Sequence, residues 1–394
     1  MKVLQVNNVY GERSTGKLTQ QVHRGLLQAG HESIVVYGRG NTANEKHVIR
    51  LCPDWYGKIN SLLSRVTGMP YGGCLLSTLR LQEIIRREKP DVVHLQCING
   101  NFVNIYRLIY WLKKHRIKTV VSLHAEFMYT ANCGHAFECQ QWKNGCQKCP
   151  NVKKANKSWF FDRVAASWKR MKEAFDGFEE NCIVAPVSPW TQERAQQSDI
   201  LKNFRFVTVY NGVDAVHTFC KDDTQPEEKT VLSVTAHFSD DPAHAKGGWY
   251  LIQLAERMPD VNFLVAGKTD EVTNKPANLH LMGEIQDQRK LADLYRRVKV
   301  SLIVSRRETF SMPCVESLCC GTPVVGFEAG APEKISLRDY SEFVPFGDLD
   351  RLEDVLRHWL MEKQVDRNAI AERACSTYSA QTMVHAFTEI YGRV

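Results

Sequence analysis

Short apolar runs alternate with longer amphipathic stretches along this chain, in two series separated by a polar segment. The amphipathic stretches, such as residues 16–29 and 102–114, carry apolar residues at helical spacing, as Leu18, Val22 and Leu26 illustrate. In the first series the strand-like runs are residues 3–6, 33–37, 91–95, 119–123, 183–187 and 206–210. Strands that alternate with helices form parallel sheets built from βαβ units. We therefore expect an α/β chain.

The second series repeats this pattern after the polar stretch 221–229. Its strand-like runs are residues 230–234, 261–266, 300–304 and 323–326, and its helical stretches are 248–258, 288–297 and 313–320. Two series predict two doubly wound, Rossmann-like domains that face each other across a cleft. The predicted boundaries are 1–212 for the first domain, 213–229 for a linker, 230–376 for the second domain and 377–394 for a helix that packs back on the first. Ligands of such sheets bind beyond the carboxyl ends of the strands, so we expect the site in the cleft.

The composition is that of an ordinary globular chain, but its charge is unevenly distributed. The 394 residues are 43% hydrophobic and 24% charged, which argues against a disordered or fibrous protein. The first apolar run is too short for a signal peptide, and no run approaches the ~20 apolar residues that a transmembrane helix needs. Residues 1–210 hold 30 Lys and Arg against 16 Asp and Glu, whereas the remainder is net acidic. We expect the first half to face an anionic partner, and chance variation of surface charge is the alternative.

The most specific motif is the run 308–316, in which Glu308 and Glu316 are separated by seven residues. Pro313 suits the first turn of a helix, and Ser311 suits its N-cap. The amides at the start of that helix would then form a phosphate site. A carboxylate in the next turn can accept hydrogen bonds from a vicinal diol such as ribose. The alternative is two solvated surface glutamates.

The motifs of this chain resemble retaining family-4 glycosyltransferases of the GT-B fold, and within them the branch of bacterial exopolysaccharide and capsule synthesis. The likeness spans nearly the whole chain. Besides E-T-F-S-M-P…E-S-L-C-C-G-T-P-V-V, it rests on G-E-R-S-T-G-K at 11–17, G-H-E at 30–32, D-V-V-H at 91–94, N-G-V-D at 211–214, K-G at 246–247 and A-P-E at 331–333.

The resemblance implies an enzyme of the hexosyltransferase type that moves a sugar from a nucleotide-sugar donor with retention and without a catalytic metal. The acceptor would be a glycan or a polyprenyl-diphosphate-linked saccharide in surface polysaccharide synthesis. The site residues that the resemblance indicates are His124, Lys246 and Glu308 for catalysis, Gly16, Thr309, Phe310, Ser311, Met312 and Glu316 for donor binding, and His94 and Lys17 for the acceptor side.

Each role has a physical reason and an alternative. Lys246 is the expected cation for the leaving diphosphate, Glu316 the ribose ligand, and Glu308 the group that orients the donor sugar. His124 follows a strand, where a histidine is also common as a cap or core residue. The family usually has an arginine after the first strand of the second domain, and residues 234–237 read V-T-A-H instead. Either Arg306, Arg307 or His237 compensates, or the diphosphate is bound more weakly.

Four cysteines lie within seventeen positions, at Cys133, Cys139, Cys146 and Cys149. The C-x-x-C pair is typical of a zinc knuckle, and the other two could complete a tetrahedral thiolate site. His135 is the alternative fourth ligand. We expect one structural zinc, since four thiolates leave no open position, and buried small hydrophobic residues are the alternative interpretation.

The segment 142–172 holds nine basic residues, and Asp162 is its only acidic residue. Its aromatic residues are Trp142, Trp159, Phe160, Phe161 and Trp168. Rings interleaved with cations suit an anionic membrane surface. We therefore expect a cytoplasmic protein bound peripherally to the inner face of the bacterial plasma membrane. A solvated helix face with aromatic residues in the core is the alternative.

Two rival functions remain open at this point. A nucleotide-sugar epimerase of the same fold would share the donor motifs. A zinc-containing nucleic-acid-binding module would account for the cysteines and basic residues but not for the E-x7-E run, so we expect no nucleic-acid partner. A dinucleotide oxidoreductase is disfavoured because neither domain shows G-x-G-x-x-G after its first strand.

Overall fold

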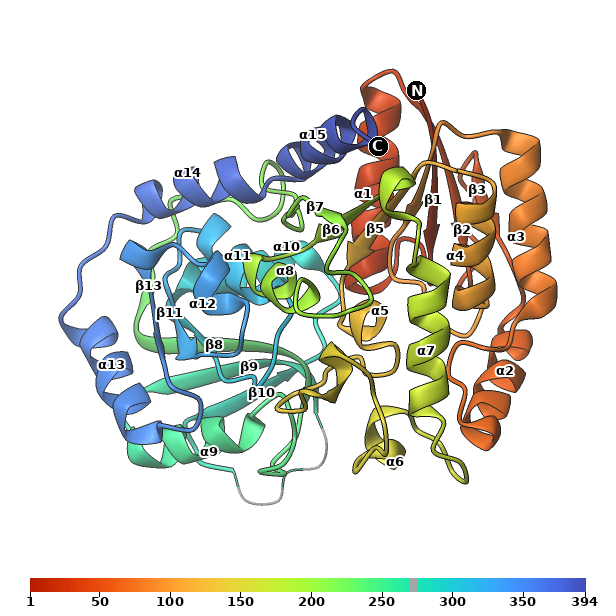
Figure 1. The fold of residues 1–394 in the computed structure, drawn as a ribbon. Coiled ribbons are helices and arrows are strands. Elements are labelled where there is room, and N and C mark those ends of the chain that lie inside the picture. The colour runs from red at the N-terminus through yellow and green to blue at the C-terminus, as the bar shows by residue number, and fades with distance from the viewer. Residues whose placement is uncertain (270–271, 273–274) are drawn as a thin grey trace. The chain divides into compact units, whose positions relative to one another are not determined.

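A computed structural model describes residues 1–269, 272 and 275–394 of the chain (Figure 1). The chain divides into two compact units. The first unit comprises residues 1–210 together with the C-terminal residues 383–394, and the second comprises residues 211–382. The sequence interpretation had set the corresponding boundaries at residues 212 and 377.

A seven-stranded parallel sheet forms the centre of the first unit, in the order β3-β2-β1-β4-β5-β6-β7. Its strands are β1 (Lys2–Asn7), β2 (Glu32–Tyr37), β3 (Val48–Arg50), β4 (Val92–Leu95), β5 (Thr119–Leu123), β6 (Cys182–Pro186) and β7 (Arg205–Phe206). The chain runs outward from β1 to β3 and then continues on the other side of β1 with β4. The loops after β1 and β4 therefore diverge, which creates the position where such sheets bind ligands.

Helices cover this sheet and form two apolar cores with it. They are α1 (Arg13–Gln28), α2 (Asp54–Thr67), α3 (Leu75–Glu88), α4 (Ile105–Lys114), α5 (Phe127–Thr130), α6 (Val152–Ala155), α7 (Val164–Phe175), α8 (Pro189–Ala195) and the last part of α15 (Ala380–Tyr391). The buried stripe of α1 contains Leu18, Val22 and Leu26, as its periodicity predicted. Phe387 and Tyr391 of α15 complete the core beside α1.

The second unit has a six-stranded parallel sheet in the order β10-β9-β8-β11-β12-β13. The strands are β8 (Glu227–Phe238), β9 (Asn262–Thr269), β10 (Leu279–Gly283), β11 (Val298–Ile303), β12 (Val324–Phe327) and β13 (Ser341–Val344). The helices are α9 (Gly248–Arg257), α10 (Gln288–Arg297), α11 (Met312–Cys319), α12 (Pro332–Ile335), α13 (Leu349–Met361) and α14 (Arg367–Tyr378). Two Rossmann-like parallel-sheet units confirm the predicted α/β architecture.

Two predicted boundaries were wrong. The linker was expected to extend to residue 229, but residues 227–229 already belong to β8, which begins at Glu227 and continues to Phe238. The run 206–210 was expected to be a strand, but β7 contains only Arg205 and Phe206. Among the described residues, none of the helices combines the length and the apolar character that a membrane crossing requires.

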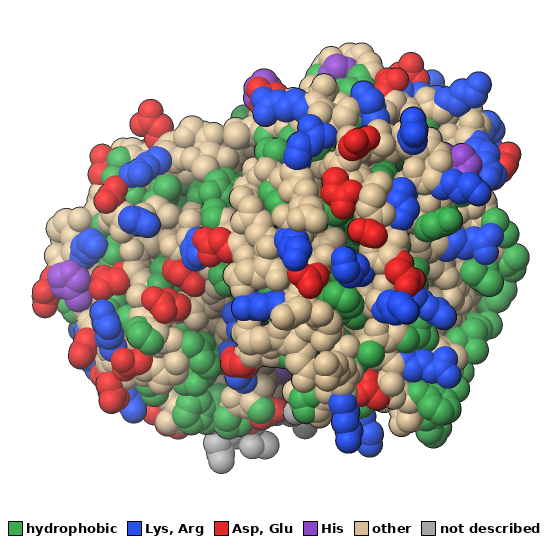
Figure 2. Space-filling model, viewed as in Figure 1, with side chains coloured by type: hydrophobic (Ala, Val, Ile, Leu, Met, Phe, Trp, Pro, Cys, Tyr) green, Lys and Arg blue, Asp and Glu red, His purple; other side chains and the backbone are tan. Residues whose placement is uncertain are grey.

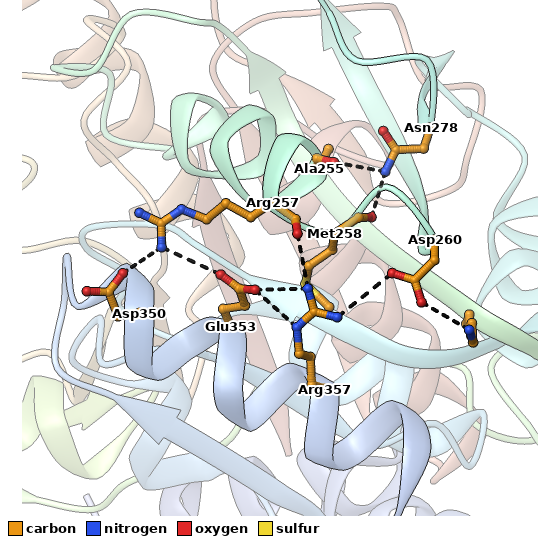
Figure 3. Close-up of polar contacts among 9 residues, drawn as sticks. Ala255, Arg257, Met258, Asp260, Asn278, Asp350, Glu353 and Arg357 are labelled. Carbon is orange, nitrogen blue, oxygen red and sulfur yellow. Dashed lines mark hydrogen bonds and ion pairs between the residues drawn. The ribbon is translucent and has the colours of Figure 1, made fainter.

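An ion-pair network on the second unit joins α9 to α13 (Figure 3). Arg257 at the end of α9 pairs with Asp350 at 2.6 Å and with Glu353 at 3.6 Å. Arg357 pairs with Glu353 at 2.9 Å and donates to the carbonyl oxygen of Arg257 at 3.0 Å. Networks of several charges hold geometry better than isolated surface pairs do. The network therefore fixes the C-terminal end of α9, whose first residue follows Lys246 and Gly247.

Candidate functional site

Lys246 and Glu308 form an ion pair in the second unit, with Nζ 2.6 Å from Oε1. Lys246 lies just before α9, and Glu308 lies in the loop after β11. The two side chains are 32% and 20% exposed, so a ligand can reach them. Both residues line a small pocket that also contacts Ser233, Thr235, Ser311 and Pro313. Because β8 and β11 are neighbours, this pocket lies at the carboxyl ends of adjacent strands.

Gly247 explains why the lysine lies against the end of β11. Its φ of +71° is in the left-handed region that favours glycine, and a Cβ there would lie 2.1 Å from the carbonyl oxygen of Val304. The K-G pair therefore lets the backbone before α9 approach the strand closely. The amide of Arg306 also donates to the carbonyl oxygen of Ala245 at 2.8 Å, which holds the Lys246 and Glu308 loops together.

The A-P-E turn holds the Glu308 loop from its other side. The Glu308 amide donates to the Ala329 carbonyl oxygen at 2.9 Å, and the Ala331 amide donates to the Glu308 carbonyl oxygen at 3.2 Å. The Glu333 carboxylate accepts from the amides of Ala329 at 3.0 Å and Gly330 at 2.8 Å. Glu333 thus positions the loop that carries Glu308.

The first turn of α11 faces the same pocket through Ser311 and Pro313. Pro313 lies in the first turn, as predicted. Ser311 occupies the predicted N-cap position, although its side chain makes no capping hydrogen bond. Its φ of +93° turns the chain sharply instead. The first amides of a helix have no intrahelical partner and can bind an anion, here beside the Lys246 ammonium.

Glu316 lies in α11 and is only 8% exposed, which excludes a solvated surface glutamate. The hydroxyl of Tyr295 on α10 donates to its Oε2 at 3.2 Å. Burial and the Glu316 carboxylate both raise the pKa of Tyr295, so the phenol stays protonated and remains a donor. Thr309 and Phe310 are buried as well, and the Phe310 ring lies 6.5 Å from the ring of Tyr378. Met312 is half-buried.

The residues that could replace the absent arginine differ in position. Arg306 is exposed and lies in the loop after β11, three residues beyond its end, and its amide is bonded to the Ala245 carbonyl oxygen beside Lys246. Arg307 is half-buried. The His237 ring lies 5.5 Å from the ring of His244. Which of them contacts a diphosphate stays a prediction.

In the first unit, Gly16 and Lys17 belong to α1, in agreement with the helical stretch expected at residues 16–29. A Cβ on Gly16 would lie 3.0 Å from Val9 Cγ2, and the Gly16 carbonyl oxygen accepts from the Gly11 amide at 3.0 Å. Gly16 therefore lets α1 pack closely on the loop after β1. Lys17 is half-buried.

His94 is a core residue, which corrects its predicted place on the acceptor side. It is fully buried, with Nδ1 2.7 Å from the Tyr391 hydroxyl and Nε2 2.8 Å from Ser122 Oγ. Burial and the neighbouring His124 lower the pKa of His94 to about 3, so it is neutral. His124 follows β5 and is half-buried, and burial lowers its pKa to about 4. A neutral imidazole can orient a substrate hydroxyl but carries no charge.

The predicted zinc site is not seen. Among the described residues, no group of three or more His, Cys, Asp or Glu side chains is arranged to hold a metal ion. Cys133, Cys139, Cys146 and Cys149 are free and half-buried. Burial and the neighbouring thiols raise the pKa of Cys133 and of Cys146 to about 12.

Sequence reasoning also missed an ion pair in the core of the first unit. Glu126 is fully buried and accepts from Arg194 at 2.7 and 3.1 Å. These residues are 68 positions apart, so no local pattern connects them.

Two family sequence models match this chain. The model described as Glycosyltransferase Family 4 matches residues 15–217, which is more than half of the chain. The model described as Glycosyl transferases group 1 matches residues 242–362. The first match covers most of unit 1, and the second covers the segment that contains Lys246, Glu308 and Glu316.

Named proteins are similar over most of its length. The putative colanic acid biosynthesis glycosyl transferase WcaC of Escherichia coli K12 is 23% identical over 419 residues and covers 99% of both chains. The GDP-mannose-dependent alpha-(1-6)-phosphatidylinositol dimannoside mannosyltransferase of Mycobacterium tuberculosis H37Ra is 23% identical over 349 residues, which are 86% of this chain and 82% of that protein. The crystal structure of Anabaena HepE in complex with UDP-glucose matches 100% of both chains, with a TM-score of 0.65 and 12% identity.

Proposed function

Since the chain belongs to glycosyltransferase family 4, we propose that it transfers a sugar from a nucleotide-sugar donor, with retention, to a glycan or lipid-linked saccharide in surface polysaccharide synthesis. The observation that carries this proposal is the Lys246–Glu308 pair beside the first turn of α11. HepE, whose structure holds UDP-glucose, supports the donor class. WcaC, named for colanic acid biosynthesis, supports the polysaccharide role.

The proposed chemistry needs charge at the leaving diphosphate. The Lys246 ammonium has three donor positions and uses one for Glu308, so two can meet phosphate oxygens. The first amides of α11 add dipoles that require no reorganisation during transfer. Glu308 holds the lysine and orients the donor sugar, and Glu316 accepts from the ribose. We assign no residue of the protein as a nucleophile. In the proposed transfer, the departing phosphate takes the proton of the acceptor hydroxyl.

The donor proposal is tested by thermal unfolding of the full chain with UDP-, GDP-, ADP- and dTDP-sugars. A ligand that binds the folded state raises the melting temperature by mass action. We expect one nucleotide class to raise it in wild type and to do so less in Lys246→Ala. Lys290→Ala, an exposed lysine on α10, is the matched control. No shift with any nucleotide-sugar would contradict the proposal, and consumption of the donor without an acceptor would favour an epimerase.

We further propose that the first unit binds an anionic membrane surface. Of the five aromatic residues predicted to face lipid, Trp142 and Trp168 are buried in the core, which corrects that part of the prediction. Trp159, Phe160 and Phe161 are exposed by 50%, 71% and 51%. Exposed apolar residues that a monomer leaves in one patch commonly mark a binding surface.

The exposed patch extends onto two helices that the sequence interpretation did not include. We call the apolar face the exposed side chains Trp55, Ile59, Leu62, Leu63 and Val66 of α2, Leu75, Leu76 and Leu79 of α3, and residues 159–161. Hydrogen bonds connect these segments. The Trp159 amide donates to the Arg65 carbonyl oxygen at 2.8 Å, and the Cys74 amide donates to the Asn60 side-chain Oδ1 at 2.7 Å. Figure 2 shows hydrophobic side chains gathered at the edge where α2 and α3 lie, with Lys and Arg beside them.

The charge around the apolar face favours an anionic bilayer as its occupant. Lys58 and Arg65 lie on α2, and Lys153, Lys157 and Arg163 lie near residues 159–161. Each basic residue close to an anionic leaflet contributes about 1 kcal/mol to binding. The mycobacterial relative is named for a phosphatidylinositol dimannoside acceptor, which supports a lipid-linked acceptor for this chain.

A further inference from the structure

The first unit contains a polar cavity that the donor site does not use. Its volume of about 480 Å³ is within the range of small-molecule pockets. Arg39 follows β2, Asn99 and Asn101 follow β4, and Asn132 follows α5, the helix after β5. The cavity therefore lies beyond the carboxyl ends of strands on both sides of β1, where a sheet of this topology binds ligands.

The charge of this cavity has one sign. Arg39, Arg65 and Lys157 line it, and none of the described residues that line it is Asp or Glu. The Arg39 Nε donates to the amide oxygen of Asn8 at 3.1 Å, and the Arg65 guanidinium lies 6.0 Å from the centre of the Trp159 ring. In the described part of the chain, no carboxylate pairs with any of these three cations. A concave surface with unneutralised positive charge attracts anions.

Two buried asparagines in the lining have unused acceptors. Asn132 and Asn156 are 4% and 6% exposed, and their Nδ2 atoms donate to the carbonyl oxygens of Val164 and Gly68. Both Oδ1 atoms are without a hydrogen-bond partner among the described residues. These two atoms each expose less than 1 Å², so a ligand hydroxyl reaches them only when the amides turn, and satisfying a buried acceptor favours that turn. Saccharides carry such hydroxyls in quantity.

His135 is held at the wall of the cavity by the buried Glu126. Its Nδ1 lies 3.7 Å from Glu126 Oε1, while Arg194 binds the other carboxylate oxygen at 2.7 Å. Burial alone would raise the pKa of Glu126, but the nearby His135 ring and the charge of Arg194 hold that pKa below its usual value. Arg194 neutralises this carboxylate, so Glu126 does not cancel the positive charge of the cavity. His135 keeps Nε2 for a ligand.

From this arrangement we propose that the cavity binds an anionic group of the saccharide acceptor, either a phosphate or the carboxylate of a uronic acid. Arg39, Arg65 and Lys157 hold the charge, and the asparagine amides bind neighbouring hydroxyls. This inference rests on the proposed function in taking the ligand to be an acceptor. Ser61 and Ser64 of α2 line the cavity, while Leu62 and Leu63 of the same helix belong to the apolar face. A phosphate-linked lipid would therefore meet the cavity directly beside the membrane surface.

Hydrogen exchange of the full chain, read by mass spectrometry, tests the proposal with glucose 1-phosphate, glucuronate and glucose as probes. We expect at least one anionic probe to slow exchange in residues 60–71 and 132–137, and glucose to have no such effect. Protection by glucose 1-phosphate alone indicates a phosphate-bearing acceptor, and protection by glucuronate alone indicates a uronate. Equal protection by glucose, no protection, or protection confined to residues 244–248 and 305–316 would overturn the proposal.

Variants separate this site from the donor site. Arg65→Gln is expected to weaken the effective anionic probe at least tenfold and to leave the thermal shift by a nucleotide-sugar unchanged. Arg86→Gln is the matched control, since that exposed arginine of α3 also lies over a tryptophan ring, 5.2 Å from the centre of Trp111. If Lys246→Ala loses the nucleotide-sugar shift and keeps protection of residues 60–71, the two sites are separate. Equal weakening by both arginine variants would overturn the assignment.

Discussion

At the scale of single residues, Glu316 offers a direct test of the donor site. Replacing it with Gln keeps its size but removes the charged acceptor that a ribose diol would use. We expect Glu316→Gln to weaken nucleotide-sugar binding by about ten- to a hundredfold, measured by calorimetry, because hydrogen bonds to a charged group contribute about 1.5–3 kcal/mol. Tyr295→Phe should weaken binding less, since it frees Oε2 without removing the carboxylate. Equal affinity in wild type and Glu316→Gln would refute the assignment.

His94 makes a prediction about acid sensitivity. Its folded pKa of about 3 lies below the ordinary histidine value, so below pH 6.5 the unfolded chain binds a proton that the folded chain does not. Stability contributed in this way is complete above pH 6.5 and falls as the pH drops toward 3, by up to about 1.4 kcal/mol per pH unit. His94→Leu should flatten the dependence of unfolding free energy on pH between 6.5 and 4.

Denaturant unfolding of the first unit's signal at several pH values measures that slope. Phe387→Leu is the matched control, because this ring lies 4.7 Å from the His94 ring and cannot titrate. The control should lower stability at every pH and keep the slope. A slope in His94→Leu as steep as in wild type would show that other groups cause the acid sensitivity.

At the scale of elements, the connection from β8 to α9 depends on Gly247. Gly247→Ala must accept both a positive φ and a Cβ 2.1 Å from a carbonyl oxygen. Gly283 has nearly the same φ, +72°, but a Cβ there would meet no atom within 4 Å. We expect Gly283→Ala to cost about 1 kcal/mol of stability, and Gly247→Ala to cost more and to lower transfer activity, since Lys246 is displaced. Equal unfolding midpoints for the two variants would contradict this account.

The elements also show what the sequence could and could not predict. Strands β1, β2, β4 and β5 were recognisable because parallel strands covered on both faces are continuous apolar runs. Helices α2 and α3 were not identified, because apolar residues lie on their outer face as well as on the buried one. In α3, Leu81, Ile84 and Ile85 are buried whereas Leu75, Leu76 and Leu79 are exposed, so the periodicity does not mark one face. Within the site, the K-G and E-x7-E motifs drew attention to Lys246, Glu308 and Glu316. The 2.6 Å ion pair between Lys246 and Glu308 lies within one unit.

What the sequence could not supply were contacts between distant positions. His94 is buried by Tyr391, which is 297 residues away, and this converts an apparent site residue into a core residue. The backbone of Ser311 was also unforeseen, because a positive φ at a serine is uncommon and no local pattern marks it. The cavity of the first unit assembles residues from five separate segments, so no single motif indicates it.

At the scale of the whole molecule, the apolar face and its basic surroundings predict reversible binding to anionic membranes. The aromatic rings and leucines of the apolar face supply apolar contact with the lipid. The neighbouring lysines and arginines supply electrostatic attraction, which salt weakens. We expect the full chain to float with vesicles that contain anionic lipid at low salt, to bind neutral vesicles less, and to release at high salt. Leu62→Glu with Phe160→Glu, two exposed positions of the apolar face, should reduce the floated fraction several-fold. Tyr110→Glu, which changes an equally exposed residue of α4 outside that face, should float like wild type. Equal flotation of the double variant and wild type would show that this face does not meet the membrane, whereas loss in the Tyr110 variant as well would indicate a general effect of added negative charge.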